Sequence, residues 1–471
     1  MRVARLMLGI PLAFFAAALL CRVWLANAPR AVAVDLAQPL PVVTYWHTFG
    51  SSLWLALFFG VAGSGIAYVF TLRALWAGKD GGATATLAWV CAASTLAVIA
   101  CLLFPVIFSS DVYAYAAYGA MSLHGLDPYA RTLLSSGDPV FSAAIWQWSN
   151  PLPVCVYGPA FVALAQGAVV AFAHFGVAGQ LLGLRVLAGL GLVACAPLAF
   201  AATRGMPQTQ RLAAAAGIAL NPIALWSATE GHNDALMVAV VLAGFVIARN
   251  GRLAPGAFVI AASSLIKAPG LAAAVALALY SWHDRSRFTR AALGGAAGIL
   301  LTALVSLPFA WGVRNVLIPH GHYAPHYSVQ WLFSAALQVA LPHRLHTFDL
   351  GVALGLLAAG SLALYGVRLA LERDREGALY MALGLWLAIP NPYPWYALWI
   401  LPVAFVALGT RASWAILIAS LATIFRYLPE ATSARDLDTN FAVTLLTIAL
   451  PFAVFVIRPA FVRERISEVE P

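Results

Sequence analysis

The sequence predicts an all-α fold, a polytopic transmembrane helical bundle. Of its 471 residues, 62% are hydrophobic and only 10% are charged, against roughly a quarter charged in soluble domains. Crossing a hydrocarbon core of about 30 Å takes roughly 20 predominantly apolar residues in a helix, and such runs recur from residue 6 to residue 457. We therefore expect about ten to thirteen membrane helices, with interfacial helices in the outer loops.

The distribution of cations predicts the orientation of the bundle. The formal net charge of +9 does not indicate nucleic-acid binding, because the cations stand in short gaps between apolar runs, where Lys and Arg hold a loop in the cytoplasm. The remaining loops are rich in Asp, His and Tyr, so we expect them to face the periplasm or the exterior. The cationic gaps contain Arg2 and Arg5, Arg73 and Lys79, Arg249 and Arg252, Arg285 to Arg290, Arg368 to Arg375, Arg411, and Arg458 to Arg465.

We treat residues 1–471 as a single integral membrane domain with no separate soluble part. It divides into N-terminal spans (1–107), an outer loop with the candidate catalytic residue (108–157), core helices (158–290) and C-terminal helices (291–471). The N-terminus resembles a secretory signal peptide, but we expect an uncleaved first helix because the downstream chain is itself a run of spans. Five cysteines at irregular positions, 21, 91, 101, 155 and 195, indicate core residues rather than disulfides or a zinc site.

The first three spans are predicted at residues 6–26, 49–72 and 84–107, which deliver the chain outside at Ser109. The next segment places Asp111, Tyr115, Tyr118 and Ser122 on one stripe of a helix, which is too polar to span and is expected to lie in the interface. Asp111 could act there as a general base. Ser109-Ser110-Asp111 is equally a typical helix cap, and the local sequence does not decide between these two roles.

Apolar runs at 158–175, 180–203 and 212–228 lead to the segment Glu230-Gly231-His232-Asn233-Asp234. Three full crossings would put this polar segment on the opposite side from Asp111. Either one run is a non-spanning helix, or the two polar segments do not share a face. Two carboxylates, an imidazole and an amide at the mouth of two helices indicate a functional cluster, with a hydrated loop as the alternative.

Residues 256–280 are interrupted at Ser263-Ser264-Leu265-Ile266-Lys267-Ala268-Pro269-Gly270. Since proline lacks a helix donor and restricts the preceding residue, we predict two half-length helices that meet at Lys267. A lysine deep in a membrane segment costs about 2.5 to 3.5 kcal/mol on insertion scales. Such a charge normally has a partner or a function.

The C-terminal half contains a second outer loop with His320, His322 and His326. These histidines fit metal binding, contact with a phosphate or sugar, or a solvated loop, and their spacing matches no structural zinc pattern. After a span at 291–311, residues 329–341 are expected to be interfacial before the next span at 350–371. The break Asn391-Pro392-Tyr393-Pro394-Trp395-Tyr396 predicts a turn at the outer surface.

Taken together and in order, these elements resemble the GT-C superfamily of polytopic glycosyltransferases, and most closely the polyprenyl-phosphate-mannose-dependent α-mannosyltransferases of bacterial envelopes. The resemblance covers residues 109–270, and the C-terminal half matches only as a hydropathy pattern. The family usually has Asn where Asp127 stands. The matching elements are Asp111 with Tyr113 and Tyr115, Gly125-Leu126-Asp127-Pro128-Tyr129, Tyr157-Gly158-Pro159, Asn221-Pro222 with Gly231-His232-Asn233-Asp234, and Lys267-Ala268-Pro269.

The resemblance implies transfer of a hexose, mannose in the first instance, from a polyprenyl-phosphate donor to an envelope glycan or glycolipid. It places the protein in the bacterial inner membrane with its active site outside, and implies Asp111 as catalytic base and Lys267 facing the lipid-linked phosphate. We expect no cofactor and no metal. The candidate substrate-binding residues are Tyr115, Asp127, Tyr129, His232, Asn233, Asp234, Lys267, His320 and His322.

Two other functions remain open on the sequence. A transporter or lipid flippase would also use broken helices and a buried lysine, although its polar residues would gather at the midplane rather than on one face. A non-catalytic scaffold for an envelope complex is the other alternative.

Overall fold

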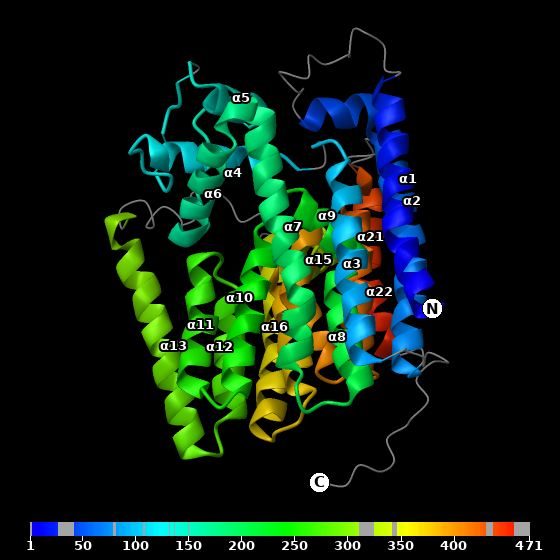
Figure 1. The fold of residues 1–471 in the computed structure, drawn as a ribbon, viewed down its shortest axis with the longest axis vertical. Coiled ribbons are helices and arrows are strands. Elements are labelled where there is room, and N and C mark those ends of the chain that lie inside the picture. The colour runs from blue at the N-terminus through cyan, green and yellow to red at the C-terminus, as the bar shows by residue number, and fades with distance from the viewer. Residues whose placement is uncertain are drawn as a thin grey trace.

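The computed structural model describes residues 2–26, 42–78, 82–106, 109–130, 132–135, 137–148, 150–309, 325–341, 346–429 and 437–455. These residues form helices and turns, and none of them forms a β-strand. The helices stand side by side with most of their axes along the long axis of the molecule (Figure 1). The predicted all-α bundle is confirmed.

Seven helical segments of the described chain are long and apolar enough to cross a membrane. A pair of helices bent by 40°, α8 (Gln208–Ala219) and α9 (Pro222–Thr229), makes an eighth if it is one span. The seven are α1 (Arg2–Ala26), α2 (Val42–Trp76), α3 (Ala83–Leu102), η1 with α7 (Ala173–Phe175, Gly176–Ala202), α13 with η3 (Arg285–Ser306, Leu307–Phe309), α16 (Thr347–Leu371), and the continuous α21, η7, α22 and η8 (Leu437–Thr444, Leu445–Ala449, Leu450–Phe452, Ala453–Phe455).

The other apolar runs of the described chain form shorter helices. At 1.5 Å per residue, a helix of 10–17 residues covers about 15 to 26 Å, less than the hydrocarbon core. They are α6 (Pro159–Ala171), α11 with η2 (Leu253–Ala262, Ser263–Leu265), α12 (Gly270–Tyr280), α15 (Val329–Ala340), α17 (Gly377–Ala388), and η4, α18 and η5 (Pro394–Tyr396, Ala397–Ile400, Leu401–Phe405). The remaining helices are α4 (Asp111–Leu123), α5 (Pro139–Gln147), α10 (Asp234–Arg249), α19 (Arg411–Ala422) and η6 (Thr423–Tyr427).

Because α6 is short, the polar segment that contains Asp111 and the polar segment 230–234 lie at the same end of the bundle. Helix α6 does not cross the bundle, whereas α7 does, and the bent α8 and α9 return the chain. The segment 230–233 therefore comes back to the end of the bundle where α4 begins (Figure 1). Of the two alternatives, the non-spanning helix is the one that the structure contains.

The predicted break at Lys267 is present. Helices α11 and α12 are connected through η2 and a turn at residues 266–269. They pack beside each other and between α10 and α13. Two half-length helices thus enter from one end and return to it (Figure 1), and Lys267 lies in the turn between them.

Three segments that the sequence placed at the membrane surface are packed against other parts of the protein. Helix α4 is enclosed by protein, because all ten residues from Val112 to Met121 are buried. Helix α15 does not cross, as expected, but it packs antiparallel along α16, where Gly351 meets Ser334 and Gly355 meets Gln330. The turn at 391–396 is enclosed by protein rather than exposed, since Pro394 and Trp395 are buried.

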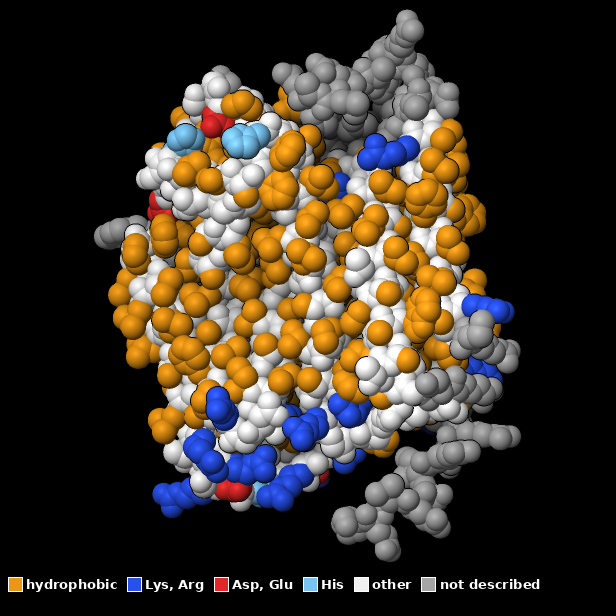
Figure 2. Space-filling model, in the orientation of Figure 1, with side chains coloured by type: hydrophobic (Ala, Val, Ile, Leu, Met, Phe, Trp, Pro, Cys, Tyr) orange, Lys and Arg blue, Asp and Glu red, His pale blue; other side chains and the backbone are white. Residues whose placement is uncertain are grey.

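The surface has a broad apolar band, and most visible Lys and Arg side chains gather at its lower edge (Figure 2). Contacts bring the cationic turns together there: Arg204 donates to Asn250 (3.4 Å), and the Tyr280 hydroxyl donates to the carbonyl of Asp374 (2.7 Å). The cationic turn near Arg204 thus lies beside the one at residues 249–252, and the turn at 281–290 lies beside the one at 368–375.

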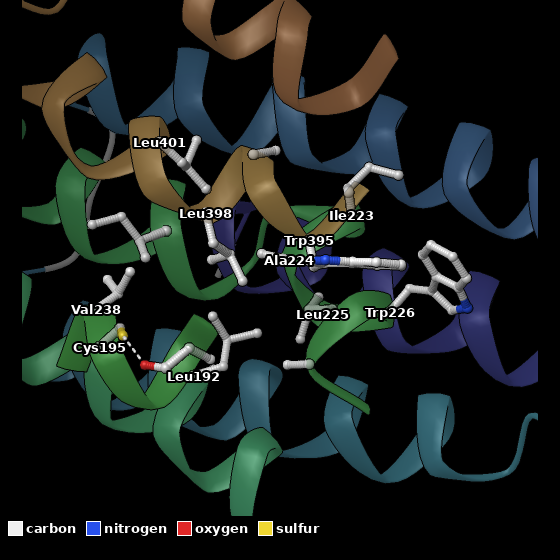
Figure 3. Close-up of a cluster of buried hydrophobic side chains, with 14 of the residues drawn as sticks. Leu192, Cys195, Ile223, Ala224, Leu225, Trp226, Val238, Trp395, Leu398 and Leu401 are labelled. Carbon is white, nitrogen blue, oxygen red and sulfur yellow. Dashed lines mark hydrogen bonds between the residues drawn. The ribbon is translucent and has the colours of Figure 1, made fainter. Parts of the chain in front are cut away.

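A buried core joins the two halves of the sequence. Leu192 and Cys195 of α7, Ile223 and Trp226 of α9 and Val238 of α10 pack with side chains from residues 395–401 (Figure 3). Trp226 is fully buried. This packing fixes the C-terminal segment against the end of α9, directly before the polar segment 230–234.

Candidate active site

Asp111 is the first residue of α4, and its side chain is not the cap of that helix. The cap position is Ser110, and the Asp111 backbone N–H donates to the Ser109 hydroxyl (3.2 Å). The Asp111 carboxylate receives a hydrogen bond from the Tyr115 hydroxyl (3.3 Å), one turn along the helix. With 19% of its side chain exposed, Asp111 is accessible, which favours the chemical role over the capping role.

His232 joins Asp111 and Tyr115 from the segment after α9. Its Nδ1 lies 3.6 Å from Asp111 Oδ2 and 3.3 Å from the Tyr115 hydroxyl. The Tyr115 hydroxyl also lies 3.0 Å from the hydroxyl of Tyr157. Four side chains from three separate segments of the chain therefore form one hydrogen-bonded network.

The surroundings of this network change its ionisation. Burial raises the pKa of Asp111 to about 6, and the charge of Lys267 together with the hydrogen bond from Tyr115 opposes part of that rise. Burial lowers the pKa of His232 well below its usual value, and the positive charge of Lys267 lowers it further. At neutral pH, His232 is a neutral imidazole and Asp111 is mostly ionised.

Asp234 and Lys267 form a buried ion pair. The Lys267 ammonium donates to both carboxylate oxygens of Asp234, at 2.8 and 2.9 Å, and the Trp399 indole N–H donates to Asp234 Oδ1. The ammonium also lies over three rings, 5.3 Å from Tyr157, 5.3 Å from Tyr396 and 5.4 Å from Trp399. Such cation–π contacts stabilise a desolvated cation. The costly lysine therefore has both an anionic partner and an aromatic cage.

The C-terminal segment 393–399 supplies a wall of the site that the sequence analysis missed. The Trp395 ring stacks on His232, with centroids 3.7 Å apart, and Tyr393 stacks on Trp395 at 4.5 Å. Tyr396 and Trp399 face Lys267 from the same segment. The run of four aromatic residues between Asn391 and Leu401 was visible in the sequence. Only the tertiary contacts show that these aromatic residues reach His232 and Lys267.

Two glycines allow the site segments to approach one another. Gly231 has φ +96°, and a Cβ there would lie 2.8 Å from Val112 of α4. Gly158 donates its N–H to the carbonyl of Ile266 (3.0 Å), and a Cβ there would overlap the carbonyl of Leu265. Gly158 thus lets Tyr157 lie against the turn that contains Lys267. This close approach explains why the Tyr157-Gly158-Pro159 element has glycine at its centre.

Arg185 is a second residue that the sequence analysis missed. Inside the span α7 and 5% exposed, it donates to the carbonyl of Thr229 at the end of α9. It also donates to the carbonyl of Phe104 beyond α3 (3.1 Å). A cation at the C-terminal ends of two helices is electrostatically favourable. Arg185 thus fixes the two helix ends that lead to Asp111 and His232. In the sequence, a single Arg within an apolar run was the feature that could have indicated its role.

The other candidates divide into three groups. Asn233 is fully buried, and among the described residues neither its amide atoms nor His232 Nε2 has a hydrogen-bond partner. Asp127 accepts from the backbone N–H of Tyr129 (2.9 Å), and the Tyr129 hydroxyl donates to the backbone carbonyl of Tyr157 (2.8 Å), so Tyr129 contacts the backbone of a site residue. His320 and His322 lie outside the described residues.

The structure therefore gathers Asp111, Tyr115, His232, Asp234 and Lys267 at one end of an apolar helical bundle. This arrangement is that of a GT-C-type glycosyltransferase of the membrane. Residues 12–283 match the family model described as alpha-(1->6)-mannopyranosyltransferase, N-terminal domain, which is more than half of the chain. The chain belongs to this family of mannosyltransferases, and the family membership argues against a transporter or a scaffold.

Individual relatives agree with the family match. The chain is 30% identical over 400 residues to alpha-(1->6)-mannopyranosyltransferase A of Mycobacterium tuberculosis, covering 76% of this chain and 72% of that protein. It is 28% identical over 430 residues to a probable alpha-(1->6)-mannopyranosyltransferase of Mycolicibacterium smegmatis, covering 76% and 71%. Its match to alpha-(1->6)-mannopyranosyltransferase A of Corynebacterium glutamicum is 26% over 235 residues, covering 45% and 46%. No solved structure gives a significant match.

Proposed function

We propose that the protein transfers mannose from a polyprenyl-phosphate donor to a mannose-containing envelope glycan or glycolipid, and forms an α-(1→6) linkage. The observation that carries this proposal is the placement of an accessible carboxylate, Asp111, beside a buried cation, Lys267, at one end of the bundle. The linkage follows the names of the relatives. The lipid-linked donor follows from the depth of the site.

Helix α10 indicates the depth of the site, because it runs from Asp234, the partner of Lys267, to Arg249 at the cationic end. Sixteen residues at 1.5 Å each separate them by about 24 Å, which is most of the roughly 30 Å hydrocarbon core. With the cationic end in the cytoplasm, the ion pair lies near the outer boundary of the membrane. A phosphate linked to a polyprenyl chain occupies that depth, whereas a soluble nucleotide sugar does not.

In the proposed reaction, Asp111 takes the proton from an acceptor hydroxyl as its oxygen attacks the anomeric carbon. The bond from that carbon to the phosphate oxygen breaks, and the polyprenyl phosphate leaves with the electron pair. The leaving phosphate needs fixed positive charge rather than a second acid. An ammonium has three N–H donors, and Lys267 uses two of them on Asp234.

Asp234 is less suited to act as the base, because Lys267 and Trp399 hold its oxygens and its side chain is fully buried. His232 and Tyr115 orient the Asp111 carboxylate instead. His232 Nε2 and the Asn233 amide are the polar groups beside the site that are proposed to contact the sugar or ordered water.

The proposal is tested with membranes that contain the protein and radiolabelled polyprenyl-phosphate mannose. We expect the label to appear in an acceptor glycan, and we expect no transfer when GDP-mannose is supplied to purified protein instead. Purified protein that uses GDP-mannose directly, or membranes in which the lipid-linked label never reaches a product, would contradict the proposed donor. Digestion of the product with a linkage-specific α-mannosidase identifies the linkage.

The pH dependence of transfer follows from Asp111. A base with a pKa of about 6 is active when ionised, so kcat/KM is expected to reach a plateau above about pH 7 and to fall about tenfold per pH unit below about pH 5. His232 does not titrate near pH 6, since its pKa is far lower, and a phosphodiester donor stays ionised throughout. A profile that is flat between pH 5 and 8 would remove Asp111 as the base.

A further inference from the structure

Trp148, the residue after α5, lies beside the start of α4. Its indole N–H donates to the carbonyl of Ser110 (3.1 Å), and Ser110 directly precedes Asp111. Despite this hydrogen bond, 41% of Trp148 is exposed. The indole is thus anchored at its polar edge next to the candidate base, while part of the ring remains open.

The chain holds Trp148 in place on both sides. Before it, Asp138 caps α5 by accepting from the backbone N–H groups of Val140 and Phe141. The backbone N–H of Trp148 donates to the carbonyl of Ala144 (3.0 Å). After it, the Asn150 side chain makes two hydrogen bonds with the backbone of Leu134, at 3.2 and 3.3 Å. An aromatic side chain fixed in this way loses little conformational entropy when it binds a ligand.

The two sides of Asp111 differ in chemistry. Toward Lys267 stand Tyr115 and Tyr157, whose hydroxyls lie 3.0 Å apart, and the Lys267 cation suits the phosphate of the donor. Toward Ser110 stands Trp148, which offers a neutral aromatic surface. The C–H face of a sugar packs on such a surface, and ligand sites commonly combine aromatic walls with a few polar groups.

We propose that Trp148 is the platform on which the acceptor sugar stacks, so that its attacking hydroxyl points to Asp111. This inference rests on the proposed function, because it takes the Lys267 side as the donor side. It deepens that function by separating the two substrates: Lys267 governs the engagement of the donor, and Trp148 governs that of the acceptor. Trp148 is therefore a residue that positions the acceptor, and it takes no proton.

The test uses full-length protein and, as acceptor probe, a synthetic octyl glycoside of two α-(1→6)-linked mannose units. In steady-state transfer, Trp148→Ala is expected to raise the KM for the probe about tenfold, the effect of losing about 1.4 kcal/mol of binding, with the donor KM unchanged. Trp148→Phe keeps a ring and should recover most of the affinity. The matched control is Trp146→Ala, because Trp146 lies two residues earlier in α5 and is 49% exposed.

Direct binding of the probe to the Asp111→Asn variant, with and without Trp148→Ala, separates this inference from the proposed function. Probe binding that depends on Trp148, found together with a wild-type protein that transfers no mannose, would support the platform and contradict the proposed reaction. An unchanged probe affinity in Trp148→Ala, an equal loss in Trp146→Ala, an equal rise in the donor KM, or no binding of the probe at all would each overturn the platform.

Discussion

Asp111→Asn is expected to reduce mannose transfer about 10²- to 10⁴-fold, the usual contribution of a general base. The amide has nearly the shape of the carboxylate and can still accept from Tyr115, so the fold should persist. Donor binding should also be unchanged, because the donor phosphate is assigned to the Lys267 side. The measurement is single-turnover transfer from the lipid-linked donor, together with the thermal unfolding midpoint of the purified variant.

Asp138→Asn is the matched control for this substitution. Asp138 is a carboxylate of the same outer segment, caps α5 and lies 3.3 Å from His124. Asn serves nearly as well as Asp at a helix cap, so this variant should transfer at close to the wild-type rate. If Asp111→Asn keeps wild-type turnover, Asp111 is not the base. If both variants lose activity together, a general disturbance of the outer segment is the cause.

Lys267→Met is expected to cause the second large loss, in stability as well as in activity. It leaves the Asp234 carboxylate buried without its cation, and breaking a buried ion pair from one side typically costs about 3 to 5 kcal/mol. Lys267→Ala, with a smaller side chain, should lose stability for the same reason. In the fraction of this variant that remains folded, we expect mainly weaker binding of the donor. The measurements are the unfolding midpoint in detergent and the donor KM.

The double variant Asp234→Asn with Lys267→Met separates the structural role from the chemical one. It removes both charges at once, so much of the lost stability should return, whereas transfer should stay low because no cation faces the leaving phosphate. Restored transfer in the double variant would show that the pair serves folding alone. An unchanged donor KM in either stable variant would also contradict the phosphate role of Lys267.

The sequence by itself determined the class of fold and the local elements of the site. Hydropathy and the scarcity of charge decide between water and membrane. The interruption at Lys267 was equally readable, because proline acts on its own helix. Asp111, His232 and Asp234 stood out as polar residues at the ends of apolar runs, and the structure brings all three together around Tyr115 and Lys267.

Only the tertiary structure decided how these segments meet. Whether α6 crosses depends on a helix length that hydropathy does not resolve. The stacking of Trp395 on His232 joins residues 163 positions apart, and the anchoring of Trp148 on Ser110 depends on how α5 packs against α4. Contacts of this kind arise from packing between distant segments, whereas periodicity and composition report only on near neighbours in the chain.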